Sequence, residues 1–335
     1  MGGGQATRLG LSLREPLPWS ALVEVARTAE DTAYEAVFVP EIAGRESFAT
    51  LAALAEATDR LSLGTGVVTI AARSPVLTAM AAGTVHELSG GRLILGVGAG
   101  SRASAVGVHS AAAWDHPLDR TRAFLRLVRA TLAGGEVRAG PPYPVAGFRS
   151  ALSLDTIPPV WLAALGDRMV ALAGEEADGA LLNICTPERV RQARALAREA
   201  AAGAGRDPAD VTIAVYVRAC LLGTRDDLAL DALRAAIGAY VVLPPYRRQF
   251  EAMELSTEAE AAAKAMEAGR PVDVPAELVD AVAVRGGRAE WEARLGAYRA
   301  AGADLVVVYP VPAGDPVSSL IGTVLAAAPA TAVER

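Results

Sequence analysis

The chain has 335 residues, of which 52% are hydrophobic and 21% charged, so it holds enough apolar material for a large core. Its net charge of −6 comes without a basic stripe, which argues against nucleic acid as a partner. The first residues lack the apolar segment of a secretory signal, and no stretch of transmembrane length is free of charges. Cys185 and Cys220 fit no metal spacing. We therefore expect a cytoplasmic protein without metal, membrane or nucleic-acid partners, and interpret residues 1–7 as a loose N-terminal tail.

Apolar runs typical of strands alternate along the chain with amphipathic runs typical of helices. The expected strands are Leu9–Leu13, Ala36–Val39, Leu61–Gly66, Leu93–Val97, Val160–Ala164, Gly179–Asn183, Thr212–Val217 and Leu305–Tyr309. The expected helices are Trp19–Ala33, Phe48–Thr58, Pro75–Leu88, Pro117–Ala133, Arg168–Glu176, Pro187–Ala202, Asp226–Ile237 and Arg288–Ala301. Eight strands with helices between them predict an α/β fold, a (β/α)8 TIM barrel. A doubly wound sheet has the same local pattern, and only the strand count separates the two.

Three segments are longer than the connections of a minimal barrel. Residues 101–117 follow the fourth expected strand, and residues 136–158 are rich in proline and predict an extended excursion. Residues 239–286 follow the seventh strand and include a charged helical run from Tyr246 to Ala268. We expect a single domain over residues 1–335, with insertions after strands four and seven. In a barrel both insertions would lie near the catalytic face.

The segment Leu61 to Ser101 is the most informative part of the chain. An apolar run ends in Gly64-Thr65-Gly66, a helical stretch follows, and a second apolar run ends in Gly98-Ala99-Gly100-Ser101. Strand, helix and strand form a parallel crossover unit. Both strands end in small residues, which expose backbone at the carboxyl edge of the sheet, where α/β proteins bind their ligands.

Three blocks of the sequence resemble a known family: Gly64–Gly100, Pro158–Asn183 and, more weakly, Ala297–Val311. They resemble the bacterial luciferase-like superfamily of (β/α)8 barrels. Within it they are most similar to the coenzyme F420-dependent oxidoreductases, the group that includes methylenetetrahydromethanopterin reductase. The resemblance implies a redox enzyme that binds a deazaflavin or a flavin at the carboxyl end of the barrel.

The resemblance also implies which residues contact the cofactor. A β-bulge with a cis peptide between Gly66 and Val67 would support one face of the ring, although an ordinary strand can also end in glycine. Small residues after the fourth strand would let backbone amides approach the cofactor, although they also suit a flexible turn. The latter residues are Gly98, Ala99, Gly100 and Ser101.

A third cofactor contact is expected between the fifth strand and its helix. Ala164, Leu165 and Gly166 would cradle the phosphate of the cofactor at the helix N-terminus. The plainer interpretation is a helix start capped by Asp167.

Glu41 and His109 are the expected catalytic residues. The resemblance places an acidic residue near Glu41, after the second strand, where it contacts the cofactor or assists proton transfer. Relatives often carry a histidine next, and Ile42 stands there in this chain. His109 and His116 lie in the loop after the fourth strand, where a solvated histidine is the plainer interpretation. We assign His86 to helix packing or capping.

The favoured function is hydride transfer between reduced coenzyme F420 and a small organic substrate. A flavin mononucleotide (FMN)-dependent monooxygenase on the same fold is an alternative, because binding through backbone fits both cofactors. A non-catalytic ligand-binding barrel is an alternative of another class. The expected partner is a small-molecule substrate, and a homodimer is possible. Tyr240, Tyr246, Arg247 and Arg248 could line a substrate entrance or contact an anionic tail, although surface charges usually do neither.

Overall fold

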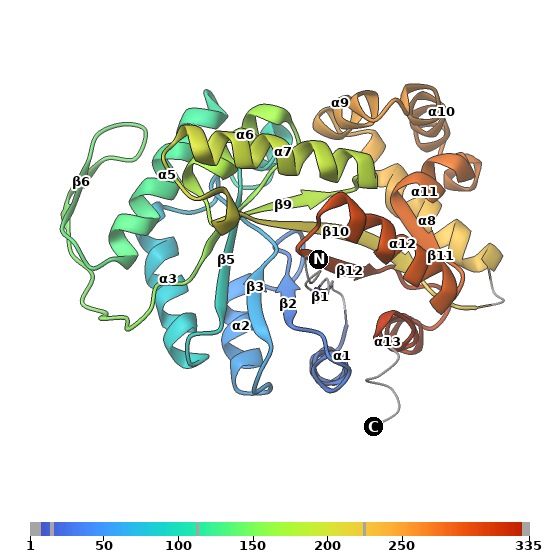
Figure 1. The fold of residues 1–335 in the computed structure, drawn as a ribbon, viewed down its shortest axis with the longest axis horizontal. Helices are drawn as coiled ribbons and strands as arrows, with labels where there is room; N and C mark the ends of the chain where they lie inside the picture. Colours follow the sequence, from blue (N-terminus) through green and yellow to red (C-terminus); the bar gives the residue numbers. More distant parts are fainter. Residues whose placement is uncertain (1–7, 14–16, 112–113, 224–225, 330–335) are drawn as a thin grey trace, which may run out of the picture. The chain divides into compact units, whose positions relative to one another are not determined.

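The structure is a computed structural model that describes residues 8–13, 17–111, 114–223 and 226–329 (Figure 1). The expected tail, residues 1–7, lies outside the described residues. The chain forms two compact units. Unit 1 comprises Met1–Val37, Leu182–Ala195 and Ile213–Arg335, and unit 2 comprises Phe38–Leu181 and Leu196–Thr212. The organisation as a single domain stays a prediction.

Unit 2 contains most of the first half of the sheet, and its strands are almost fully buried. The strands of this half and their bounds are β2 (Ala36–Val39), β3 (Ser62–Thr65), β4 (Val68–Thr69), β5 (Leu93–Gly98), β8 (Val160–Ala163) and β9 (Gly179–Asn183). Residues 36–37 of β2 and 182–183 of β9 belong to unit 1. β5 pairs in parallel with β3, β4 and β8. The covering helices pack in sequence order and are α2 (Ser47–Ala55), α3 (Pro75–Leu88), α5 (Pro117–Leu132) and α6 (Asp167–Glu176). The third barrel strand, β3, ends at Thr65. The short β4 begins after Gly66 and Val67.

Unit 1 contains strands with equally continuous apolar sequences, as expected for a buried parallel sheet. They are β1 (Arg8–Ser12), β10 (Thr212–Cys220), β11 (Ala283–Arg285) and β12 (Leu305–Pro310), in the order β11-β10-β12-β1. Their helices include α1 (Trp19–Asp31), α12 (Arg288–Ala301) and α13 (Pro316–Ala327). The long α7 (Pro187–Gly203) and a short 3-10 turn, η1 (Pro208–Asp210), connect β9 to β10.

The complete strand order is β11-β10-β12-β1-β2-β3-β5-β8-β9, and β9 also pairs with β10. This order closes eight parallel strands into a barrel, with β11 as an extra strand beside β10. The predicted (β/α)8 fold is therefore confirmed, and each of the eight expected strands is present. The sequence-based list had no helix after the last strand, whereas the structure has α13 there.

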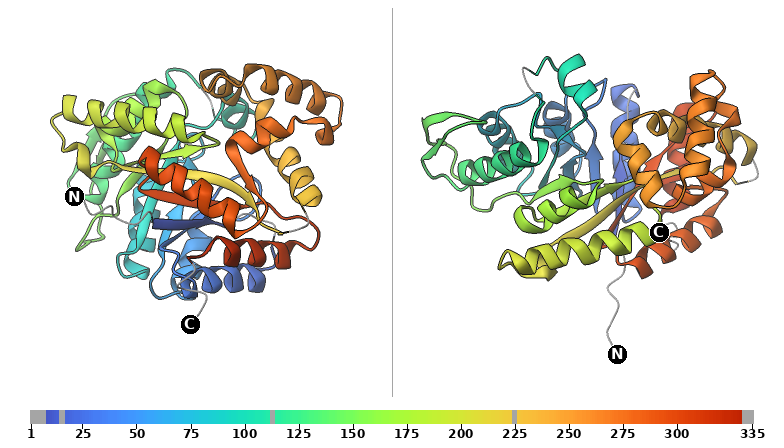
Figure 2. Two further views of the ribbon diagram at one scale, coloured as in Figure 1. Left: turned by 45° about the vertical axis from the view of Figure 1, so that its right-hand side comes forward. Right: turned by 90° about the horizontal axis from the view of Figure 1, so that it is seen from above.

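The insertion after the seventh barrel strand is helical, but the expected single run from Tyr246 to Ala268 is wrong. Two helices form instead, α9 (Pro244–Ala252) and α10 (Ser256–Glu267). Between them Glu254 adopts a left-handed conformation with φ of 61°, which turns the chain without glycine or proline. Both helices pack on α8 (Asp226–Val241), as do the 3-10 turn η2 (Pro271–Asp273) and α11 (Ala276–Val282), and Figure 2 shows this group in two orientations.

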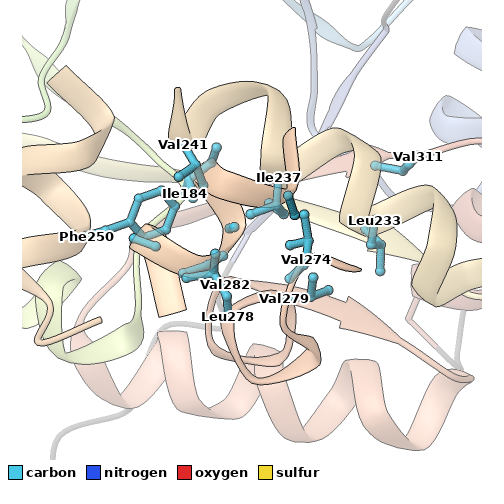
Figure 3. Close-up of a cluster of buried hydrophobic side chains, with 14 of the residues drawn as sticks. Ile184, Leu233, Ile237, Val241, Phe250, Val274, Leu278, Val279, Val282 and Val311 are labelled. Atoms are coloured by element: carbon cyan, nitrogen blue, oxygen red, sulfur yellow. The ribbon is translucent and has the colours of Figure 1, made fainter. Parts of the chain in front are cut away.

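An apolar cluster holds these helices together. Figure 3 shows Phe250 of α9 and Val241 of α8 close to Val282 of α11, all fully buried. Burial of such side chains contributes about 2 kcal/mol each. The insertion is therefore a packed part of unit 1 with its own apolar core.

The other two long segments also contain regular structure. Residues 136–158 include an antiparallel hairpin of β6 (Val137–Ala139) and β7 (Val145–Phe148), which extends from α5 in Figure 1. After β5, a short helix α4 (Arg102–Gly107) precedes α5. No single helix among the described residues has the length and apolarity to cross a membrane. The bent pair α8 and α9, with 105° between its helices, passes that test of length and composition only when joined.

Candidate functional site

The break between β3 and β4 lies where the sequence predicts a bulge. The peptide between Gly66 and Val67 is cis, which confirms the expectation. Gly66 N donates to Val39 O of β2 over 2.8 Å, and Thr65 Oγ1 both donates to Gly96 O (2.6 Å) and accepts from Gly96 N (2.8 Å). These bonds attach the break to the strands on both sides of it, so its backbone is held in place by β2 and β5.

The end of β5 is shaped by packing as well as by exposure. A Cβ atom added to Gly98 would lie 2.7 Å from Val67 Cγ2, so this glycine makes room for the valine. Ala99 is half-buried and Gly100 is exposed, with φ of 72°. Ser101 is the N-cap of α4, and its Oγ accepts from Ser104 N over 3.1 Å. Gly100 therefore leaves the most accessible backbone at this strand end.

The loop from β8 to α6 exposes backbone at one residue. Ala164 N donates to Leu181 O of β9 over 3.0 Å, so this amide serves the sheet. Gly166, which is exposed, is the N-cap of α6, and a Cβ added there would meet nothing within 4 Å. The interpretation in which Asp167 caps the helix is therefore wrong, because Asp167 is already the first helical residue. A helix N-terminus with open space above it suits a phosphate.

Glu41, the expected acid, follows β2 and is paired with an arginine that the sequence analysis missed. Arg73 donates from Nη2 to Glu41 Oε1 (2.6 Å) and from Nε to Glu41 Oε2 (3.4 Å). Both side chains are 15% exposed. Arg73 also pairs with Glu46, the N-cap of α2, and its guanidinium lies 5.0 Å from the ring centroid of Phe48. Glu41 therefore connects the end of β2 to the segment after β4.

The surroundings of Glu46 and Arg73 favour the charged form of each side chain. Burial raises the pKa of Glu46. Backbone hydrogen bonds from Ala49 and Phe48, together with Arg73, lower this pKa by more than burial raises it, so the net shift is downward. Burial lowers the pKa of Arg73, and Glu41 and Glu46 more than restore it. The signal in the sequence was weak, because Arg73 is 32 residues from Glu41 and no motif joins them.

The three histidines have different surroundings. His109 is half-buried after α4, and its backbone N donates to Ser104 O. His116 is exposed and is the N-cap residue of α5. His86 is 4% exposed, and its Nε2 lies 3.0 Å from Thr156 Oγ1, which confirms its packing role. Burial lowers the pKa of His86.

Unit 1 contains a polar cluster at its own strand ends. Arg218 of β10 is 2% exposed, and its Nη1 donates to Asn183 Oδ1 at the end of β9. Its Cζ lies 4.2 Å from the ring centroid of Tyr309 on β12 and 4.8 Å from that of Tyr240 on α8. Within the described part of the chain, no carboxylate pairs with Arg218. Tyr240 is a candidate from the sequence, whereas Arg218 is not, because it lies within an apolar strand.

Asn183 connects Arg218 to the insertion. Asn183 Nδ2 donates to Tyr246 Oη over 2.6 Å, and Gln249 Nε2 donates to the carbonyl oxygens of Asn183 (2.7 Å) and Ile184 (2.6 Å). These three hydrogen bonds join α9 to Asn183, the last residue of β9, and to Ile184, which follows it. They hold α9 against the end of β9. Burial raises the pKa of Tyr246, which keeps its hydroxyl protonated at neutral pH.

A cavity of about 640 Å³ lies elsewhere in unit 1, at the end of β11. Arg285 lines it and pairs with Asp226 and Asp280. Arg294 donates to the carbonyl oxygens of Ala281 and Asp280. The charged side chains that line the cavity therefore pair with one another or with backbone carbonyls. The site residues that we predict from the sequence lie in unit 2 and do not line this cavity.

Comparison with known proteins supplies a family context. A family model described as luciferase-like monooxygenase matches residues 4–305. The 5,10-methylenetetrahydromethanopterin reductase of Methanolobus tindarius is 32% identical over 229 residues, which are 67% of this chain and 68% of that protein.

Two solved structures share the fold. An F420-dependent secondary alcohol dehydrogenase, in complex with an F420-acetone adduct, has a TM-score of 0.80 and 18% identity, covering 98% of this chain and 99% of that chain. The coenzyme F420-dependent tetrahydromethanopterin reductase of Methanopyrus kandleri has a TM-score of 0.77 and 21% identity, covering 96% and 98%.

Proposed function

Because the chain belongs to the luciferase-like monooxygenase family, we propose that it is an oxidoreductase that transfers a hydride between reduced coenzyme F420 and a small organic substrate. The likeness to a methylenetetrahydromethanopterin reductase carries this proposal. Two structures that share the fold are of F420-dependent enzymes, which supports the same cofactor.

The strand ends of unit 2 fit a planar cofactor with a phosphate. Gly66 and Val67 are half-buried, and Gly100 and Gly166 are exposed, so backbone rather than bulky side chains faces outward there. Open space at Gly166 lies at the start of a ten-residue helix, whose N-terminus favours an anion. These residues, with Ala99 and Leu165, would hold the cofactor, which supplies two-electron hydride chemistry when bound.

A proton that accompanies hydride transfer would be moved by side chains near the strand ends of unit 2. Glu41 is committed to Arg73 through both carboxylate oxygens, so taking up a proton there would disrupt an ion pair. We assign Glu41 a positioning role after β2. His109 is half-buried and makes no ion pair in the described residues, so we assign proton transfer to its ring nitrogens.

The test is an equilibrium titration of the full chain with F420 and, separately, with FMN, followed by absorbance. We expect F420 to bind and its reduced form to be oxidised by the substrate without oxygen. Gly166→Leu should weaken F420 binding at least about tenfold and leave thermal unfolding unchanged, because the new side chain enters open space.

Gly140→Leu is the matched control, since Gly140 is also exposed with nothing within 4 Å of an added Cβ, but lies in the β6–β7 hairpin. It should leave cofactor affinity unchanged. Binding of FMN alone would move the assignment to an FMN-dependent monooxygenase. Binding of neither cofactor would support a non-catalytic ligand-binding barrel.

A further inference from the structure

Four neighbouring strands place polar side chains of unit 1 at the same level. Arg218 of β10 is in register with Tyr309 of β12, and the pairing of Leu11 with Val308 places Ser12 of β1 level with Tyr309. Asn183 of β9 contacts Arg218 from the other side. Residues in register on parallel strands point to the same face of the sheet. These side chains therefore form one polar layer near the carboxyl ends of their strands.

The layer is rich in hydrogen-bond donors and poor in acceptors. A guanidinium has five N–H groups, and Arg218 uses one for a described hydrogen bond, to Asn183 Oδ1. Tyr246 Oη accepts from Asn183 Nδ2, which leaves its own hydrogen to donate. Ser12 Oγ is 1% exposed at the residue level and has no hydrogen-bond partner among the described residues. Buried polar groups normally have hydrogen-bond partners, so these donors could bind the acceptor atoms of a ligand.

The charge of the layer is also uncompensated. Arginine stays protonated in proteins, and Arg218 has aromatic rings and a neutral amide as its described partners. Arg189, a second buried arginine of unit 1, lies on α7. The planar fork of a guanidinium matches the two oxygens of a carboxylate, with which it forms two parallel hydrogen bonds.

The geometry points to a carboxylate-binding site in unit 1, in which Arg218 pairs with the two oxygens and Tyr246 and Ser12 donate to them. Asn183 is a positioning residue, because it holds both Arg218 and Tyr246. Tyr240, Tyr246 and Asn183 are partly exposed, so the cluster reaches the surface of the molecule. The site does not depend on the proposed redox activity.

The test uses the full chain and two probes of nearly equal shape, benzoate and the neutral benzamide, followed by calorimetry. We expect saturable binding of benzoate at least about tenfold tighter than that of benzamide. Arg218→Met should abolish this difference. Tyr246→Phe keeps the ring and removes the donor, so benzoate affinity should fall about fivefold. Arg191→Gln changes an exposed arginine of α7 and should have no effect.

Asn183→Asp keeps the proposal testable if Arg218→Met fails to fold. It places a carboxylate beside Arg218, so benzoate binding should be lost while the fold remains. A purely structural Arg218, which only anchors Tyr240 and Asn183, would give equal binding of benzoate and benzamide in every folded variant. That result, or no saturable binding of benzoate to the natural chain, overturns the carboxylate site.

Discussion

The two units differ in the residue types found at the carboxyl ends of their neighbouring parallel strands. In unit 2 the strand ends consist of glycine, alanine and backbone, with the charges of Glu41, Arg73 and Glu46 paired beside them. In unit 1 the strand ends carry Arg218 and tyrosines. The first arrangement suits a large, flat ligand recognised through backbone. The second suits a small charged group recognised through side chains.

Two arginines, the half-buried Arg92 and the buried Arg218, show the same contrast. Arg92 in unit 2 donates to the carbonyl oxygens of Ser89, Leu61, Ala55 and Thr58 over 2.7–2.9 Å, so its guanidinium is satisfied by backbone. Arg218 in unit 1 makes one described hydrogen bond. Arg92 therefore joins the end of α2, the residue before β3 and the end of α3, whereas most N–H groups of Arg218 have no described acceptor. Single substitutions can test this difference between the two units.

The largest effect is expected where unit 2 has no room for a side chain. A Cβ added to Gly96 would lie 2.2 Å from Thr65 O, and 3.1 Å from side-chain atoms of Leu181 and Val67. Gly96→Ala should lower the free energy of unfolding by about 3 kcal/mol, because backbone must move. Urea denaturation measures this, with Gly140→Ala as the control that should change little. A loss equal to that of the control would show that the strand ends of unit 2 are not tightly packed.

The next prediction compares the two arginines directly. Arg92→Met leaves backbone carbonyls without a donor and should lower the free energy of unfolding by about 3 kcal/mol. Arg218→Met removes a buried charge that has no described carboxylate partner and should lower it by less than about 1 kcal/mol. Chemical denaturation of both variants decides the comparison. Equal losses would mean that Arg218 is structural in the same sense as Arg92.

A smaller effect is expected at the ion-paired group of unit 2. Glu41→Gln keeps a hydrogen-bond acceptor for Arg73 but removes one charge, so stability should fall by about 1 kcal/mol. Cofactor affinity should fall with it if Glu41 positions the loop after β2. Glu56→Gln, at the exposed end of α2, is the matched control. Unchanged stability and affinity in Glu41→Gln would leave Glu41 without a structural role.

The smallest effect is a pH dependence in unit 2. Burial lowers the pKa of His86 below its usual 6.5, so the folded state favours the neutral ring. The unfolded state then binds the proton more readily, so this contribution to stability is present above about pH 6.5 and is lost as the pH falls below it. His86→Gln should therefore lose less stability than the natural chain between pH 7.5 and 5.5, measured by urea denaturation. An identical loss in both would assign that pH dependence to other groups.

The surroundings of His86 also differ from those of Arg218. The Nδ1 atom of His86 has no hydrogen-bond partner among the described residues. Arg218 lies among aromatic rings and a neutral amide, with no carboxylate partner among the described residues.

The strands, the fold class and the small residues at the ends of β3 and β5 could all be predicted from the amino-acid sequence. These features depend on local patterns: apolar runs of strand length, and glycines at their ends. The cis peptide at Gly66–Val67 followed from the family resemblance. The break between α9 and α10 was not visible in the sequence, because a glutamate occupies the left-handed position.

The pairing of the charged groups, in contrast, depends on how distant segments pack together. Arg73 and Glu41 are 32 residues apart, and Asn183 is 35 from Arg218 and 63 from Tyr246. Strand register brings Arg218 level with Tyr309, and no local pattern predicts that register between distant segments. In the sequence, Arg218 is simply a charged residue that interrupts the apolar pattern of a strand. Its neighbours on the adjoining strands make it a cation surrounded by donors and aromatic rings.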